Sequence, residues 1–212
     1  MKQIVSVALM MVITAGVSAQ QFRLNTYGTN SFDESFNYKL DPYNYYSGKI
    51  YGGLQVGAGL EYLIQSQYCV ELMYLRHSTH APTTYRAGAW TYEKTTDFDV
   101  TLNYFLIGLD GHLPTKNGKL EAYGGVFQGI MVIDTRNPVN GLKSSSTKYA
   151  WSTRLGGNFW ITKNVGIKLQ TQLLVSIQPI GGKDVFTMRD LDAFSTILQL
   201  NVGGGLTFKL GK

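Results

Sequence analysis

A two-residue alternation of apolar and polar side chains recurs along most of the chain. In the segment 50–64 the even positions are apolar from Ile50 to Ile64, except for Gly52, and the odd positions are mostly glycine or polar residues. The same pattern recurs in the segments 97–107, 148–161, 165–178 and 194–210, and more weakly in 21–30 and 68–79. Because successive side chains of a β-strand point to opposite faces, each segment predicts a strand between two different environments.

The lengths of the connections indicate how these strands are arranged. An eighth strand falls in the segment 119–134, which is apolar on both faces, so that its orientation is not indicated. Short connections near 65–67, 115–119 and 163–164 alternate with long ones near 32–47, 80–96, 135–147 and 179–193. The sequence therefore predicts an all-β fold, an eight-stranded antiparallel up-and-down barrel with four long loops at one end and short turns at the other.

The composition of the polar face indicates which side of the wall is outside. A soluble barrel would expose a face rich in Lys and Glu, whereas here the polar face is mostly Gly, Gln, Asn, Ser and Thr. This favours a transmembrane barrel with a narrow, filled lumen, in which Phe98 and Leu106 face lipid and Asp97 and Asp99 face the lumen. Aromatic residues near the ends of the apolar strips predict interfacial girdles: Tyr62, Tyr68, Tyr104, Tyr149, Trp151, Phe194 and Phe208.

Composition and charge exclude several other classes of protein. Charged residues make up 16% of the 212 residues, against about 25% in ordinary soluble domains. The single cysteine, Cys69, excludes a disulfide scaffold, and a net charge of +5 without a basic cluster argues against a nucleic-acid partner. A basic start, a short apolar run and Val17-Ser18-Ala19 predict a signal peptide over 1–19, followed by one barrel domain over 20–212.

At this point the sequence resembles the small eight-stranded outer-membrane barrels of the OmpA/OmpX/OmpW-like superfamily, and within it the outer membrane protein beta-barrel domain and PorT-like proteins. The features that carry the resemblance are the leader, the alternating strands and the closing segment Leu198–Leu210. The resemblance implies a location in the bacterial outer membrane, contact with its lipid and insertion by the barrel-assembly machinery. It implies roles that range from anchoring and partner docking to small-molecule passage, and the fold does not choose among them.

Six charged side chains have the parity of the lumen face and lie mostly toward the short-turn end: Arg23, Glu61, Glu71, Arg154, Lys168 and Lys209. Since side chains fill the interior of an eight-stranded barrel, these charges must pair with one another. We expect a structural salt-bridge plug, with a gate opened by exchange of partners as the alternative. Glu71 and Arg154 are the best candidates for a direct pair, and Cys69 is expected to be a small buried filler.

Other candidate chemistry is weaker. His77 and Ser78 point to opposite faces, whereas Ser78 and His80 share one, but no acid can be assigned to them for a lipid A deacylase-like site. We therefore expect no enzyme, no cofactor and no metal. Four tyrosines of the first long loop are candidates for contact with a partner: Tyr38, Tyr43, Tyr45 and Tyr46.

These observations predict a monomeric barrel with a filled lumen and a structural or binding role that depends on its surface loops. One alternative is a narrow or lateral channel for small hydrophobic solutes. Another is a subunit of a larger envelope or secretion complex, with an envelope or extracellular protein as its partner. A lipid A-modifying enzyme is the remaining alternative.

Overall fold

The computed structural model describes residues 22–65, 67–182 and 196–210, which form ten antiparallel strands. The strands are β1 (Phe22–Ser31), β2 (Glu34–Asp41), β3 (Asn44–Ile50), β4 (Gly53–Gln65), β5 (Tyr68–Ala87), β6 (Lys94–Pro114), β7 (Leu120–Arg136), β8 (Lys143–Trp160), β9 (Val165–Gly182) and β10 (Ile197–Leu210). Within these ranges, no helix is long and apolar enough to cross a membrane. The predicted signal peptide lies outside the described residues.

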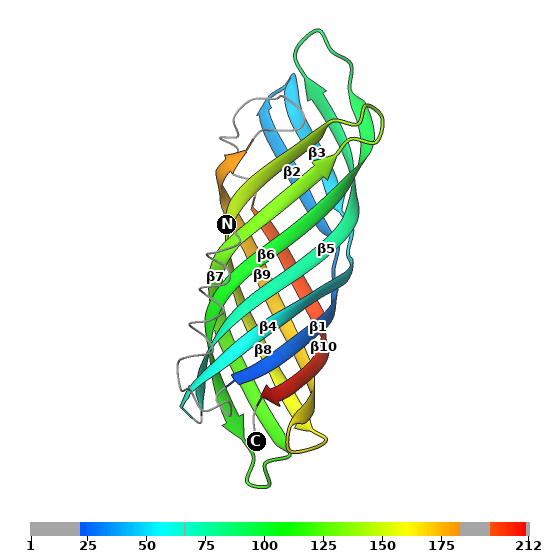
Figure 1. The fold of residues 1–212 in the computed structure, drawn as a ribbon. Helices are drawn as coiled ribbons and strands as arrows, with labels where there is room; N and C mark the ends of the chain where they lie inside the picture. The colour runs from blue at the N-terminus through cyan, green and yellow to red at the C-terminus, as the bar shows by residue number, and fades with distance from the viewer. Residues whose placement is uncertain (1–21, 66, 183–195, 211–212) are drawn as a thin grey trace, which may run out of the picture.

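Eight of the strands form a closed ring. Hydrogen-bonded pairs run in the order β4, β1, β10, β9, β8, β7 and β6, and the pairing of β5 with both β4 and β6 completes the circle. The first and last strands of the chain meet in register, from Phe22 opposite Leu210 to Ser31 opposite Asn201. The tilted strands wind around the barrel, with short turns at one end and longer connections at the other (Figure 1). The predicted up-and-down barrel is confirmed.

The predicted first long loop is itself a hairpin, formed by β2 and β3. Strand β5 has 20 residues, whereas β4 has 13. Residues 68–77 of β5 therefore pair with β4, and its residues 83–87 pair with β3. The hairpin occupies the edge that the shorter strand leaves open, so the wall continues toward the loop end.

A band of apolar side chains surrounds the turn-end part of the barrel on its outside. On β6 the outward side chains of this band are Phe105, Ile107, Leu109 and Leu113, each about half exposed or more. The neighbouring strands contribute exposed residues at the same height, such as Leu72, Val126, Leu155 and Leu169. Such a predominantly apolar surface fits contact with lipid and would be unfavourable in water.

Above this band the polarity of the wall is inverted. Phe98, Val100, Leu102 and Tyr104 of β6 are at most 4% exposed and form an apolar core inside the barrel. The prediction that this face meets lipid is therefore wrong, as is the lumen position of Asp97 and Asp99, which lie on the outside. The cause is strand length: β6 has 21 residues, and about 9–11 suffice to cross a bilayer. Water surrounds the remainder, so apolar side chains there turn inward.

The structure also tests the other expectations about which side chains face inward and which face outward. The segment 119–134, which sequence left unoriented, turns Tyr123, Phe127 and Met131 inward. Tyr104 is fully buried and belongs to no interfacial girdle, whereas Tyr149 is 38% exposed and Tyr68 is 58% exposed. Aromatic pairs do mark both borders of the band: Phe22 with Tyr62 near the turn end, and Tyr74 with Phe105 near the loop end. Phe194 lies outside the described residues.

The inverted polarity predicts unequal costs for one substitution on the two faces of β6. Leu102→Ala opens a cavity in the inner core and is expected to lower the free energy of unfolding by about 2–5 kcal/mol. Leu109→Ala, on the lipid-facing side, should cost roughly 1 kcal/mol or less, because lipid chains fill the space. Urea unfolding of the barrel in bilayers measures both. Equal losses would contradict the assignment of the two faces.

Candidate functional site

The interior at the turn end of the barrel is charged, and it is formed by one face of almost every strand. All six predicted lumen residues lie there. Arg23, Glu61, Glu71, Arg154 and Lys168 are at most 5% exposed, from β1, β4, β5, β8 and β9. Lys209 of β10 is partly exposed at the mouth, with its Nζ 3.9 Å from the centre of the Trp160 ring. The period of two thus collects side chains from distant parts of the chain into one cluster.

Arg154 is the centre of this cluster. Its guanidinium bonds to the carboxylates of both Glu71 and Asp110, and NH1 donates a hydrogen bond of 2.9 Å to the Tyr27 hydroxyl. The predicted Glu71–Arg154 pair is confirmed. The ring of Phe127 lies with its centre 4.6 Å from Cζ of the guanidinium, so the side chain is held both by charge and by an aromatic face. The arginine is thus held from several sides by charge, hydrogen bonds and an aromatic ring.

A second group surrounds Glu121 near the mouth. Arg23 donates to both of its carboxylate oxygens, at 2.7 and 3.3 Å, and Asn158 Nδ2 donates at 2.9 Å. His112 Nδ1 lies 2.7 Å from Glu121 Oε1, and its Nε2 lies 3.3 Å from the sulfur of Cys69. Glu121 therefore orients the imidazole and directs Nε2 toward the thiol.

Glu61 connects the two groups. Its Oε1 accepts hydrogen bonds from Lys168 Nζ at 2.8 Å and from Asn25 Nδ2 at 2.7 Å. Its Oε2 is buried and accepts no hydrogen bond from the described residues, although His112 Nε2 lies 3.9 Å away. One oxygen of this carboxylate is thus used structurally, and the other faces the imidazole and the thiol.

Sequence reasoning missed three members of the cluster: Asp110, His112 and Glu121. Asp110 and His112 share their parity with Leu102 and Tyr104, a face that was assigned to lipid. The sequence did contain a signal that this assignment was wrong. Asp110 and His112 are neighbours on one face at the turn end of the strand, and two such polar groups are unfavourable in contact with lipid. Glu121 lies in the segment whose orientation was not indicated. Each follows from the requirement that a buried charge must be compensated.

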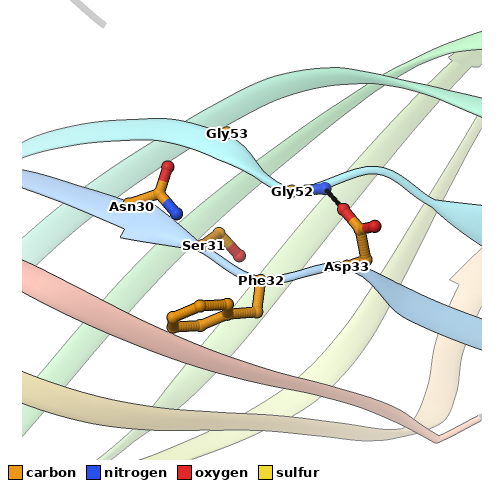
Figure 2. Close-up of a pocket in the computed structure, with 6 residues that line it drawn as sticks. All are labelled: Asn30, Ser31, Phe32, Asp33, Gly52 and Gly53. Atoms are coloured by element: carbon orange, nitrogen blue, oxygen red, sulfur yellow. Dashed lines mark hydrogen bonds between the residues drawn. The ribbon is translucent and has the colours of Figure 1, made fainter.

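Where the hairpin leaves the wall, a shallow pocket lies between β1 and β4. It is lined by Asn30, Ser31, Phe32, Asp33, Gly52 and Gly53 (Figure 2). Asp33 Oδ1 accepts the Gly52 N–H at 2.7 Å, and its other oxygen lies 2.5 Å from Lys49 Nζ. These two bonds hold the pKa of Asp33 below its usual value, and the bond from Lys49 has the larger effect. A Cβ at Gly52 would lie 2.2 Å from the Ser31 carbonyl oxygen, so only glycine fits this bend.

A polar layer lies inside the wall at the height of this pocket. Ser31, Gln55, His77 and Asn201 are at most 1% exposed. Ser31 Oγ, Gln55 Nε2, His77 Nε2 and both amide atoms of Asn201 hydrogen-bond to no other described protein group. This layer separates the charged interior near the turn end from the apolar core above.

Glu34, the first residue of β2, attaches the hairpin to the last strand. Its Oε1 accepts the backbone N–H of Leu198 at 2.5 Å. Burial of the carboxyl raises its pKa to about 7, against the opposing effects of this hydrogen bond and of the charge of Lys148. The docked hairpin therefore favours the protonated form of the Glu34 carboxyl.

The polar residues on the outer wall of β5 do not complete a hydrolytic site. His77 points inward, whereas His80 Nδ1 lies 3.3 Å from Asp99 Oδ1, which is the acid that sequence could not assign. Ser78 Oγ is 3.4 Å from the Thr101 hydroxyl. Within the described part of the chain it makes no hydrogen bond to His80, and an activated serine requires that contact to its base.

The four predicted loop tyrosines have different environments. Tyr43 is 47% exposed beneath the guanidinium of Arg86, and the Tyr45 hydroxyl bonds to Glu93. Tyr46 is 9% exposed and packs against Phe36 inside the wall, so it is not available to a partner. The side chain of Tyr38 lies outside what the structure describes.

The most exposed aromatic residues are others, in the β5–β6 connection. Trp90 is 100% exposed and Tyr92 is 89% exposed. Sequence analysis predicted a long loop near 80–96 and did not select these two residues as candidates for contact. Two large aromatic residues within a predicted loop, between Gly88 and Glu93, could have indicated an exposed contact surface.

Comparison with known proteins identifies the fold. No family model matches the sequence, and no curated protein is significantly similar. Among solved structures, Neisserial surface protein A is similar with a TM-score of 0.58 and 14% identity, over 90% of this chain and 97% of that one. OprG from Pseudomonas aeruginosa gives 0.56 and 11%, over 90% and 96%. AlkL, determined in lipid bilayers, gives 0.52 and 11%, over 94% and 95%. The chain therefore has the fold of small bacterial outer-membrane β-barrels.

The environment of Glu34 predicts a pH-dependent hairpin. Since its folded-state pKa of about 7 is above the ordinary 4.5, its contribution is complete below about 4.5 and is lost as the pH rises through 7. Hydrogen exchange at the Leu198 amide, corrected for intrinsic rates, should therefore be faster at pH 8 than at pH 5.5. Glu34→Gln should abolish the difference. A pH dependence that persists in this variant would assign the effect to another group.

The cluster predicts that removal of its central cation is far more costly than removal of a peripheral one. Arg154→Met leaves Glu71 and Asp110 without their partner and is expected to cost about 3–5 kcal/mol of folding free energy. Lys209→Met, at the partly exposed mouth, should cost much less. Adding Glu71→Gln to Arg154→Met should restore part of the loss. Urea-dependent gel migration measures all three, and equal effects of the two single variants would contradict the central role.

Proposed function

We propose that this outer-membrane β-barrel is a closed, monomeric anchor that presents its loop end to a protein partner outside the cell. The observation that carries the proposal is the filling of the interior at two heights. Arg154 and its carboxylates occupy the level of the apolar band, and the core around Leu102 occupies the level above. A barrel filled in this way supports a binding role and argues against diffusion through its centre.

The loop end has the features of a contact surface. The wall continues beyond the apolar band as hydrogen-bonded sheet, with the hairpin β2–β3 paired to β5. Trp90 and Tyr92 project from it into solvent, and Val139 of the β7–β8 connection is 83% exposed. Large aromatic side chains on a rigid support supply much of the binding energy in protein interfaces. In the small barrels that this fold resembles, the long connections face outward and the short turns face the periplasm.

A lateral conduit for small solutes is the second candidate, and the pocket beside Gly53 favours it. An ideal Cβ on Gly53 would be 3.6 Å from His77 Nε2, so only a thin layer of wall separates the pocket from the inner polar layer. A passage there would enter between β1 and β4 and bypass the charged cluster. We place this second because β1 and β4 stay paired from Phe22 opposite Tyr62 to Ser31 opposite Gly53.

No enzymatic activity is part of the proposal. On the outer wall Ser78 is hydrogen-bonded to Thr101 rather than to its candidate base, and the buried cluster offers no reacting atom to a substrate at the surface. A dedicated subunit of an envelope complex would use the same loop surface, so a stable co-purifying partner fits within the proposed function.

The proposal predicts electrical silence. Refolded protein in a planar bilayer should show no discrete channel openings, provided that heat-modifiable gel migration confirms that it is folded. Arg154→Ala is expected to stay silent as well if it folds, because the apolar core around Leu102 still fills the level above.

Reproducible openings of the unaltered protein would overturn the closed-anchor proposal. If Asn30→Trp, at the pocket, abolished those openings and Leu60→Trp, elsewhere on the outer face of the same strand pair, did not, transport would be assigned to the lateral pocket.

A further inference from the structure

We propose that the turn-end interior holds one zinc ion, bound by Cys69 Sγ, His112 Nε2 and the free oxygen of Glu61. These three ligand atoms lie within 4.8 Å of one another, and all three residues are buried. The sulfur is 3.3 Å from Nε2, and Glu61 Oε2 is 3.9 Å from the same nitrogen. Ligands of a tetrahedral zinc, at about 2.0–2.3 Å from the metal, lie about 3.3–3.6 Å apart. A movement of the Glu61 carboxylate toward the imidazole would bring these atoms to the spacing of three corners of a zinc tetrahedron, with the fourth open to water.

The unpartnered oxygen of Glu61 is the observation that points to a ligand. This carboxylate is fully buried, and its Oε1 is held by Lys168 and Asn25. Its Oε2 receives no hydrogen bond from the described residues, and the Arg23 guanidinium and His112 Nε2 lie 3.8 and 3.9 Å from it. A buried carboxylate oxygen without a partner is costly. A zinc ion between this oxygen, the imidazole and the thiol would supply the direct bond to Oε2 that the Arg23 guanidinium, at 3.8 Å, does not make.

The surroundings of His112 are those of a metal ligand. Glu121 accepts the Nδ1–H at 2.7 Å, which leaves Nε2 free to donate its lone pair to a metal. Glu121 is itself fixed by Arg23 and Asn158. A carboxylate behind the histidine is the usual outer support of zinc sites, because it sets the tautomer and the ring orientation. A thiolate and an imidazole together select zinc over calcium or magnesium.

The charges of the cluster agree with this occupant. Among the described residues, three cations are buried here, Arg23, Arg154 and Lys168, against four carboxylates, which are those of Glu61, Glu71, Asp110 and Glu121. The sum over these buried groups is one excess negative charge, and Lys209 lies partly exposed at the mouth. Zinc binding releases the Cys69 thiol proton to solvent, so the ion and the thiolate together add one positive charge, which compensates the buried excess.

The position of the site determines where the ion enters. Cys69 is the second residue of β5, Glu121 is the second of β7, and His112 is the third-last of β6. The site therefore lies just inside the turn end, behind Trp160 and Lys209. In the proposed orientation this mouth opens to the periplasm, although zinc binding itself does not depend on the proposed function.

The experiment uses the full-length mature barrel, folded both with and without zinc so that slow entry does not conceal the site. After desalting, elemental analysis should give one zinc per chain. Cobalt substitution should produce thiolate-to-cobalt charge-transfer absorption, which can come only from Cys69 because the chain has a single cysteine. Cys69→Ser and His112→Gln should each weaken zinc binding by about tenfold to a hundredfold or more.

His77→Gln is the matched control, because His77 is also a fully buried histidine but lies higher in the barrel. It should leave the zinc content and the cobalt spectrum unchanged. Gel migration checks that every variant is folded. Absence of zinc from both preparations would overturn the proposal. Zinc that persists in both Cys69→Ser and His112→Gln would likewise overturn it.

Discussion

The structure depends on the compensation of carboxylates that are buried inside a narrow wall. Arg154 bonds to two of them, and backbone glycines create the space that the carboxylates occupy. A Cβ at Gly59 would lie 1.9 Å from Glu71 Oε1, and a Cβ at Gly125 would lie 2.0 Å from Asp110 Oδ1. The strand glycines that sequence analysis associated with a filled lumen are thus the complement of the charged side chains. Without the glycines the charged side chains would not fit in the interior, and without the charged side chains the space beside the glycines would be empty.

Much of the fold could be predicted from a period of two, because the lipid and the lumen impose opposite demands on alternate residues. The lumen parity of Arg23, Glu61 and Lys168 followed directly from it. The rule failed on the loop-end half of β6, where Phe98 and Val100 have the apolar pattern of a lipid face but lie inside. Alternation reports that two faces differ and does not report which medium surrounds the outer one. Strand length relative to the bilayer carries that information.

The candidate site was predictable in composition but not in contacts. Parity identified Glu71 and Arg154 as facing the same interior, and the structure brings them together. His112 was missed as an isolated histidine, because its partners Cys69 and Glu121 lie 43 and 9 residues away and meet it only through the register of three strands. The hairpin β2–β3 was assigned to a long loop, although Phe36, Tyr38 and Leu40 alternate with Ser35, Asn37 and Lys39 in the sequence of β2. Its stability comes from pairing with β5, which is a tertiary effect.

The seam between the first and last strands has a consequence for how the chain reaches this state. Thr26 Oγ1 accepts the N–H of Leu206, a partner 180 residues away in the sequence, and the full β1–β10 ladder spans similar separations. Bringing such distant segments together has a large entropic cost, and contacts of this kind slow folding. Until the seam closes, the sheet is open on both sides and its carboxylates lack part of their surroundings. Assembly is then most easily lost while the seam is still open. The stability of the finished barrel does not protect the chain at that stage.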